Sequence, residues 1–156
     1  IAAYILATSF WETGRTMQAV KEKTDKTGEA YFFRMYDIKG SRPQVAKRLG
    51  NLYPGDGVKF AGRGQVQLTG RTNYFNMGNY LKLDLINNPD LLLDTKVSAR
   101  VLVHGIIEGS FTGVGINRYV TNLKTDYVNA RRIINGVDKA NEIANIATQF
   151  EKAIVN

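Results

Sequence analysis

Apolar residues recur along most of this chain at the three- and four-residue intervals of an α-helix. Residues 1–12 are almost all apolar and end near Gly14, which predicts a buried helix. A second clear pattern, over residues 138–154, predicts an amphipathic helix. Its apolar face comprises Ala140, Ile143, Ala147, Phe150 and Ile154.

Proline, glycine and helix-capping residues predict four further helices between these two. Residues 41–50 have Pro43 in the first turn and Gly50 just past the end. Thr69 is expected to cap a helix that runs to about Leu81, and Asp94 to cap one through about Glu108. Residues 127–134 form the fourth.

Glycines interrupt the helical pattern in the middle of the chain. Residues 51–64 contain Pro54 and four glycines, which predicts a loop or a small β-hairpin. Polar and apolar residues then alternate over 65–69, so we expect an extended segment with Gln65, Gln67 and Thr69 on one face. The whole pattern predicts a mainly α-helical fold in one domain, residues 1–156.

Composition excludes several kinds of chemistry. The 156 residues include no cysteine, which excludes disulfide bonds, thiolate metal ligands and a cysteine nucleophile. The single histidine, His104, falls within a predicted helix and cannot form a histidine-rich metal site. A formal charge of +7 favours a polyanionic partner: nucleic acid, an anionic membrane or an acidic cell wall. Because the basic residues are scattered, charge alone does not choose among these.

The apolar runs are too short to cross a membrane, which takes about 20 residues. The chain starts inside an apolar run without a methionine, so we expect that residues preceding Ile1 have been removed. A targeting signal in such a segment would not be visible in this sequence.

Glu12 is the first candidate for catalysis, because it is the one carboxylate in the N-terminal apolar stretch. Apolar neighbours disfavour the charged form of a carboxylate and raise its pKa, which suits a general acid near neutral pH. The alternative is a glutamate that caps or solvates the end of the helix, as charged side chains usually do.

The segment from Lys59 to Tyr74 carries a second set of candidates. Gly62 and Gly64 flank Arg63 and permit close approach of another chain. Amide and hydroxyl groups beside aromatic residues suit sugars, whose hydroxyls are polar and whose ring faces are apolar. Those groups belong to Gln65, Gln67, Thr69 and Asn73. The segment lacks the spacing of a phosphate-binding loop, and the alternative is an ordinary tight turn before a helix.

Three segments resemble motifs of glycoside hydrolase family 19, and they occur in the order of that family. Trp11-Glu-Thr-Gly14 is similar to a His-Glu-Thr-Gly motif. Residues 60–74 are similar to a Tyr-Gly-Arg-Gly-Pro-Ile-Gln-Leu-Thr segment, and residues 131–136 to a late Ile-Asn-Gly motif. Chain length and residues 55–57 and 111–113 resemble the phage and prophage endolysin branch, whose members attack peptidoglycan.

The resemblance implies a mainly α, lysozyme-like, two-lobed helical domain with the glycine-rich loop or small β-hairpin at the cleft. It also implies an inverting mechanism with two carboxylates and neither metal nor cofactor. Glu12 falls on the general acid. Gln67, Thr69 and Asn73 fall on positions that hold the catalytic water or bind sugar, and Asn135 falls on a substrate-contacting asparagine.

The resemblance implies Glu22 as the general base, because endolysin-like members have a glutamate ten residues after the first. Inversion requires the two carboxyl groups roughly 6.5–9.5 Å apart, with room for a water. Glu29 and Asp25 are the alternatives. Glu22 also lies in a charged stretch, residues 21–26, of the kind that is usually solvated surface.

The sequence departs from the family pattern at two places. Trp11 stands where a histidine usually precedes the acid, and an indole there would exclude water from Glu12. Gln65 and Val66 stand where the chitinases have Pro-Ile, which changes the expected shape of the loop. Arg63 is expected to be structural, ordering the loop or pairing with a carboxylate.

Together these patterns predict a hydrolase that cleaves the β-1,4 bonds of peptidoglycan glycan strands, as a phage lysis enzyme does. The alternatives are a chitinase acting on β-1,4-linked N-acetylglucosamine and a catalytically inactive glycan-binding protein. We expect a monomer without a nucleic-acid partner, because no recognition helix or stacking platform accompanies the charge. We expect it in the host bacterial cytoplasm before lysis, or secreted if a signal preceded Ile1.

Overall fold

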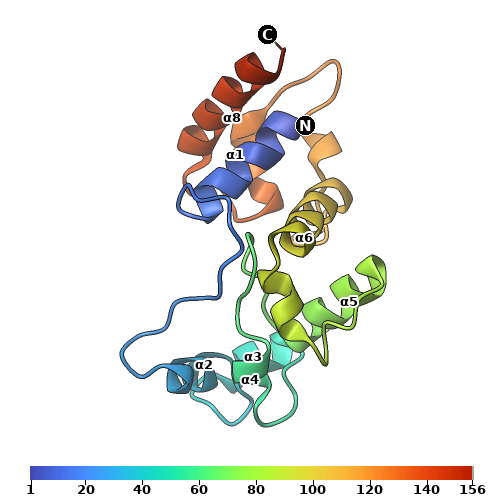
Figure 1. Cartoon of the computed structure of the whole chain (residues 1–156). Coiled ribbons are helices and arrows are strands. Elements are labelled where there is room, and N and C mark those ends of the chain that lie inside the picture. Colours follow the sequence, from blue (N-terminus) through green and yellow to red (C-terminus); the bar gives the residue numbers. More distant parts are fainter. Residues whose placement is uncertain (156) are drawn as a thin grey trace. The chain divides into compact units, whose positions relative to one another are not determined.

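The computed structural model describes residues 1–155 and is mainly helical, as predicted (Figure 1). Strand pairing in the described residues is limited to isolated bridges, one of which joins Arg63 to Leu68. None of the described helices is long and apolar enough to span a bilayer. The α-helices are α1 (Ala2–Glu12), α2 (Glu29–Tyr36), α3 (Pro43–Leu49), α4 (Asp56–Lys59), α5 (Arg71–Leu81), α6 (Thr95–Glu108), α7 (Tyr127–Ala130) and α8 (Ala140–Val155). Short 3-10 helices are η1 (Pro89–Leu93), η2 (Ile116–Arg118) and η3 (Arg131–Ile133).

The chain divides into two compact units. Unit 1 comprises Ile1–Met17 and the chain from Arg100 onward, and unit 2 comprises Gln18–Ala99. The boundary at residue 100 falls within α6. Each unit has its own buried apolar residues, and the expectation of one catalytic domain over 1–156 stays a prediction.

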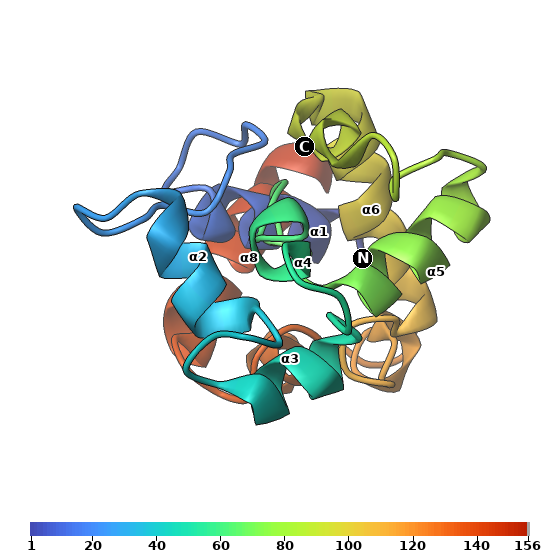
Figure 2. The same cartoon turned by 90° about the horizontal axis from the view of Figure 1, so that it is seen from below.

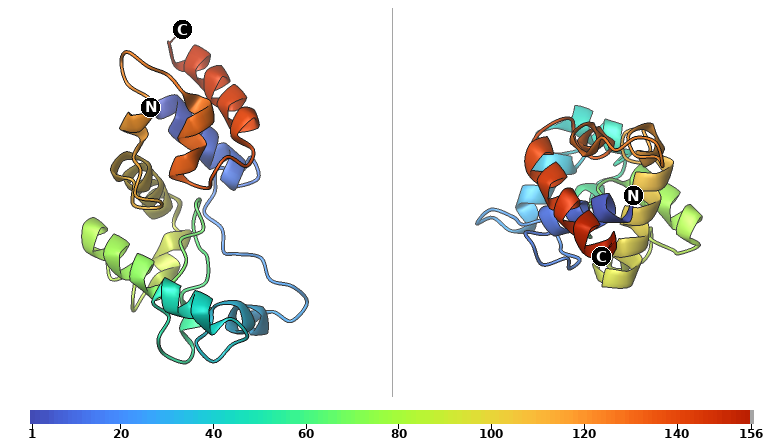
Figure 3. Two further views of the ribbon diagram at one scale, coloured as in Figure 1. Left: turned by 180° about the vertical axis from the view of Figure 1, so that it is seen from behind. Right: turned by 90° about the horizontal axis from the view of Figure 1, so that it is seen from above.

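Unit 1 is built on the packing of α1 against α8 (Figures 1 and 3). Small residues such as Ala7 and Ala147, both fully buried, let the two helices approach closely. The predicted apolar face of α8 is confirmed for Ala140, Ile143 and Ala147. The predicted face is wrong for Ile154, which is 52% exposed. α8 has 16 residues and α1 has 11, so α1 does not cover the end of α8.

Unit 2 contains two helices that the apolar pattern missed. The aromatic cluster at 31–36 lies in α2, which begins after Gly28 and buries Phe32. The segment expected to be loop contains the single turn α4, and α2 packs against it (Figure 2). Both helices are short, so their stability comes from this packing rather than from a long periodic pattern.

The helix ends follow local signals in most cases. Pro43 starts α3, Gly50 ends it with a φ of 72°, and the Asp94 carboxylate accepts hydrogen bonds from backbone N–H groups at the start of α6. Thr69 does not cap α5: the N-cap is Gly70, and the Thr69 hydroxyl donates to the Gln67 carbonyl instead. The predicted helix over 127–134 is α7 followed by η3.

The alternating segment 65–69 is not an extended strand. Residues 64–67 form a turn, and Arg63 and Leu68 exchange backbone hydrogen bonds of 3.2 and 2.9 Å across it. Gln67 has a φ of 52°, which is incompatible with alternation. The side chain of Gln65 is buried rather than presented with Gln67. The pairing across this turn is the single bridge between Arg63 and Leu68, and it lies after most of residues 51–64, which were predicted to be a loop or a small β-hairpin.

Candidate active site

In unit 1, the last residue of α1, Glu12, forms an ion pair with Arg131 at the start of η3. The Arg131 side chain is only 4% exposed, whereas that of Glu12 is 24% exposed. Nε of Arg131 also donates to the Asp138 carbonyl at 3.0 Å, which fixes the guanidinium from its other side. A buried cation therefore holds the Glu12 carboxylate, a neighbour that the apolar stretch around Glu12 did not indicate.

Two buried residues share the face of α1 that leads to Glu12. Tyr4 and Thr8 precede Glu12 by two turns and one turn, and both are fully buried. The Tyr4 ring stacks on that of Tyr127 with a centroid separation of 6.0 Å. Burial raises the pKa of the Tyr4 hydroxyl to about 12, so this hydroxyl remains neutral at physiological pH.

In unit 2, both carboxylate oxygens of Glu22 are held. The Tyr36 hydroxyl donates to Oε1 at 2.7 Å, and the Gly62 N–H donates to Oε2 at 3.2 Å. The backbone of Glu22 also donates to the Gly62 carbonyl at 2.8 Å. Burial and the Glu22 carboxylate raise the pKa of Tyr36, which keeps its hydroxyl protonated as a donor. Glu22 is thus fixed in place rather than a solvated surface glutamate.

Oxygen atoms of three side chains, from two segments of unit 2, converge on Gly62. A Cβ placed on that glycine would lie 2.9 Å from Glu22 Oε2, 3.0 Å from Gln67 Oε1 and 3.2 Å from Thr69 Oγ1. The structure therefore brings together three of the six predicted site residues. We call Glu22, Gln67 and Thr69 the acceptor cluster.

The hydrogen bonds of the acceptor cluster determine what it can bind. The Gln67 amide nitrogen donates to the Val20 and Gly64 carbonyls at 2.9 and 3.0 Å, and the Thr69 hydroxyl donates to the Gln67 carbonyl at 2.8 Å. The donors of the cluster are therefore used internally, and its oxygens remain to accept. Such a group suits a water molecule or a sugar hydroxyl, each of which brings its own hydrogens.

The other two predicted sugar contacts lie in different units. Asn73 is exposed on α5 of unit 2, and its amide nitrogen donates to the Thr69 carbonyl at 2.7 Å. Asn135 is exposed in unit 1, just past η3, and its backbone N–H donates to the Arg131 carbonyl. Phe60 and Tyr74 are the aromatic residues that the sequence indicates as suitable for contact with a sugar. Both are fully buried in the core.

Arg63 is structural, as expected. Its side chain is 5% exposed, and Nε pairs with Asp90 at 2.7 Å. Nη1 donates to the Lys59 and Ala61 carbonyls and to the Tyr74 hydroxyl, so one guanidinium ties the loop to α5. Its carboxylate partner, Asp90, is 74% exposed at the surface.

The two alternative bases are less well placed for catalysis. Asp25 is held by Thr27 and Arg34, and hydrogen bonds from Thr27 chiefly lower its pKa. Glu29 is an exposed residue in the first turn of α2. Among the three candidates, Glu22 has a restrained carboxylate beside other predicted site residues.

Within residues 1–155, no three histidine or acidic side chains gather as a metal site.

Gly62→Ala tests the acceptor cluster. The φ of Gly62 lies outside the left-handed region, so an alanine backbone is tolerated, but its Cβ would displace the Glu22 carboxylate. We expect kcat on a glycan substrate to fall by about 10-fold, because the carboxylate moves by less than the displacement of about 1 Å that costs about 100-fold. The melting temperature should change little. An unchanged kcat would show that these oxygens take no part in the reaction.

Comparison with solved structures identifies the fold. The chain matches the crystal structure of chitinase C from Streptomyces griseus HUT6037 with a TM-score of 0.70 and 23% identity, over 97% of this chain and 58% of that one. A match at this identity shows the fold, which is that of a helical chitinase.

Sequence comparison identifies the family. The family model for class I chitinases, glycoside hydrolase family 19, matches residues 1–137. The chain therefore belongs to glycoside hydrolase family 19, which confirms the resemblance of the three motifs.

The curated relatives include proteins named as endochitinases and one named as inactive. An acidic 27 kDa endochitinase of Solanum lycopersicum is 34% identical over 94 residues, which cover 51% of this chain and 38% of that protein. A protein of Hevea brasiliensis named inactive chitinase-like protein 1 is 49% identical over 41 residues, 26% of this chain and 13% of that protein. The chain thus spans less than half of these relatives.

Proposed function

We propose that this chain is a glycosidase that hydrolyses β-1,4 bonds between N-acetylated sugars with inversion at the anomeric carbon. The observation that carries the proposal is the acceptor cluster, in which a restrained carboxylate, Glu22, lies beside Gln67 and Thr69 in a member of family 19. The mechanism also requires a second carboxylate. Glu12 can supply it, because the ion pair with the buried Arg131 fixes the orientation of its carboxylate.

Glu12 acts as the general acid. Its proton passes to the glycosidic oxygen as the bond between that oxygen and the anomeric carbon breaks. The carboxylate left on Glu12 after this step is the form that pairs with Arg131, so Glu12 takes up a proton again before the next cycle. A fixed guanidinium stabilises the charge that develops in the transition state without needing to reorganise.

Glu22 acts as the general base. A water that donates its hydrogens to Glu22 and to Thr69 or Gln67 directs a lone pair away from the acceptor cluster, toward the anomeric carbon. As the new bond forms, one proton of the water passes to Glu22, and the configuration of the carbon inverts. Tyr36 and the Gly62 N–H keep the carboxylate aligned for this transfer.

Peptidoglycan glycan strands are the proposed substrate. The formal charge of +7 supports an approach to an anionic cell envelope, and it implies that association slows as salt increases. Chitin is the second candidate, because the named relatives are chitinases.

The identity of the first product tests the mechanism and the substrate together. We expect purified bacterial walls to lose turbidity, and a soluble β-1,4-linked oligosaccharide to release an α-anomer first, as followed by proton NMR. A β-anomer would contradict inversion. Cleavage of N-acetylglucosamine oligomers but not of walls would make the protein a chitinase.

A glycan-binding protein without activity is the second candidate function. The relative named as inactive and the tryptophan at position 11 favour it. It predicts retention of the protein on walls or chitin with no new reducing ends.

A further inference from the structure

Unit 2 has a concave surface that contains no residue of the acceptor cluster. This pocket has a volume of about 870 Å³ and lies between the loop before α4, one face of α5 and the segment that follows α5. Sites for small ligands commonly have volumes of about 300–1,000 Å³. Asn73, the proposed sugar contact on α5, does not line it.

The pocket is lined by large apolar side chains that are unusually exposed. Tyr53 is 62% exposed, Phe75 is 53% exposed and Leu52 is 57% exposed. Aromatic residues of this size normally contribute to a core. Two exposed aromatic side chains that line one pocket therefore indicate a binding surface. Thr72 and Asn79 add a hydroxyl and an amide to the same lining.

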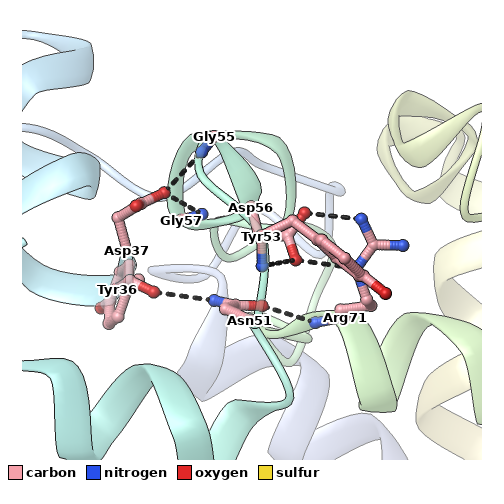
Figure 4. Close-up of polar contacts among 8 residues, drawn as sticks. All are labelled: Tyr36, Asp37, Asn51, Tyr53, Gly55, Asp56, Gly57 and Arg71. Atoms are coloured by element: carbon pink, nitrogen blue, oxygen red, sulfur yellow. Dashed lines mark hydrogen bonds and ion pairs between the residues drawn. The ribbon is translucent and has the colours of Figure 1, made fainter. Parts of the chain in front are cut away.

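A buried polar network fixes the Tyr53 side of the pocket (Figure 4). Asp56, 3% exposed, accepts two hydrogen bonds from the Arg71 guanidinium at 2.8 and 2.6 Å and one from the Tyr53 backbone at 3.2 Å. The guanidinium carbon lies 5.0 Å from the centre of the Tyr53 ring. The ring is therefore stacked on a cation that cannot move away from its carboxylate.

The same network anchors the loop to two helices. Asn51 is fully buried; its amide nitrogen donates to the Tyr36 carbonyl at 3.0 Å, and its oxygen accepts from the Arg71 backbone at 2.8 Å. Asp37, also fully buried, accepts from the backbone of Gly55 and Gly57 at 2.8 and 3.1 Å (Figure 4). The loop that carries Tyr53 is thus held in place before any ligand arrives, which lowers the entropic cost of binding.

The charges of the lining indicate a neutral ligand. Arg71 is neutralised by Asp56, and Lys82 and Asp84 contribute one charge of each sign. A pyranose sugar meets these requirements. It has no net charge, and its apolar ring faces can pack on Tyr53 and Phe75. Its hydroxyl and amide groups can form hydrogen bonds with Thr72 and Asn79. We propose that this pocket is a second glycan-binding site, which holds a neutral N-acetylated sugar of the polymer away from the catalytic residues.

Such a site would retain the protein on an insoluble polymer between cleavage events. The identity of the sugar rests on the proposed function, but binding at the pocket is independent of hydrolysis. Two weak sites on one chain raise the effective concentration of polymer at the catalytic residues. A soluble oligosaccharide too short to reach both sites gains nothing from the second one.

Tyr53→Ala and Phe75→Ala, singly and together, test the proposal. We expect the double variant to degrade insoluble chitin or walls about 5- to 20-fold more slowly, with hydrolysis of a short soluble oligosaccharide within about 2-fold of the parent. Tyr80→Ala, which removes another exposed aromatic of α5 outside the pocket, is the matched control and should change neither rate. Equal loss on soluble and insoluble substrates would overturn the proposal.

Binding is measured separately by NMR in the Glu12→Gln background, with hexameric N-acetylglucosamine or peptide-free glycan strands as probes. We expect backbone resonances of residues 52–53, 75 and 79 to shift on titration, and Tyr53→Ala to abolish these shifts. Shifts at residues 67–69 alone would overturn the second site while leaving the proposed function intact. Shifts at the pocket in a protein without hydrolytic activity would support the site and contradict the function.

Discussion

Replacing Glu12 by glutamine is expected to lower kcat on a glycan substrate by about 10²- to 10⁴-fold, the usual contribution of a general acid. Glutamine has nearly the same shape but no acidic proton to give to the leaving oxygen. Its carbonyl oxygen can still accept the hydrogen bond from Arg131, so the helix end and the buried guanidinium keep a partner. Substrate binding, measured as KM or as retention on polymer, should therefore be nearly unchanged.

Two comparisons separate this role from a structural one. Glu142→Gln makes the same change of charge at an exposed residue of unit 1, and we expect parental activity. Glu12→Ala leaves the buried Arg131 without its carboxylate, so it should also destabilise the protein, by less than the about 3–5 kcal/mol of a fully buried pair because Glu12 is 24% exposed. Parental activity in Glu12→Gln would show that another residue supplies the proton.

Replacing Glu22 by glutamine is the second change with a large expected effect, again a fall in kcat of about 10²- to 10⁴-fold. The amide keeps an oxygen for the Tyr36 hydroxyl or the Gly62 N–H, but it cannot take a proton from water. Azide needs no deprotonation before it attacks. We expect added azide to restore part of the rate and to give a glycosyl azide, a product that a purely structural loss would not yield.

Matched variants discriminate among the three candidate bases. Asp25→Asn and Glu29→Gln remove a negative charge within seven residues of Glu22, and each should retain activity within about 2-fold, as surface changes usually do. If either variant loses activity and Glu22→Gln does not, the assignment of the base is wrong. If all three remain active, the acceptor cluster serves binding only.

Local chemistry explains which parts of the fold the sequence predicted well. A proline in the first turn, a glycine just past the end and a capping aspartate act within one turn of backbone, so Pro43, Gly50 and Asp94 marked helix ends correctly. The apolar face of α8 was equally readable until Ile154, where the partner helix no longer covers it. Short elements such as α2 and α4 left no periodic signal, because their stability comes from each other.

Alternation failed at residues 65–69 for a related reason. Period two indicates a strand only when a neighbouring strand supplies a ladder of hydrogen bonds. Here the partner is the same chain folded back across a turn, so Gln67 adopts a positive φ and its side chain bonds to the Val20 and Gly64 carbonyls. The presence of a glutamine at position 67 was informative, but the alternating pattern did not predict on which side of the segment the Gln67 side chain lies.

The sequence by itself determined the family, through three ordered motifs, and with it the residues that carry the candidate chemistry: Glu12, Glu22, Gln67 and Thr69. Only the tertiary structure decided their environments. Arg131 meets Glu12 from 119 residues away, and Tyr36 and Gly62 meet Glu22 from 14 and 40 residues away. Electrostatic and hydrogen-bond partners are set by distance in space, which a local pattern of residues does not encode.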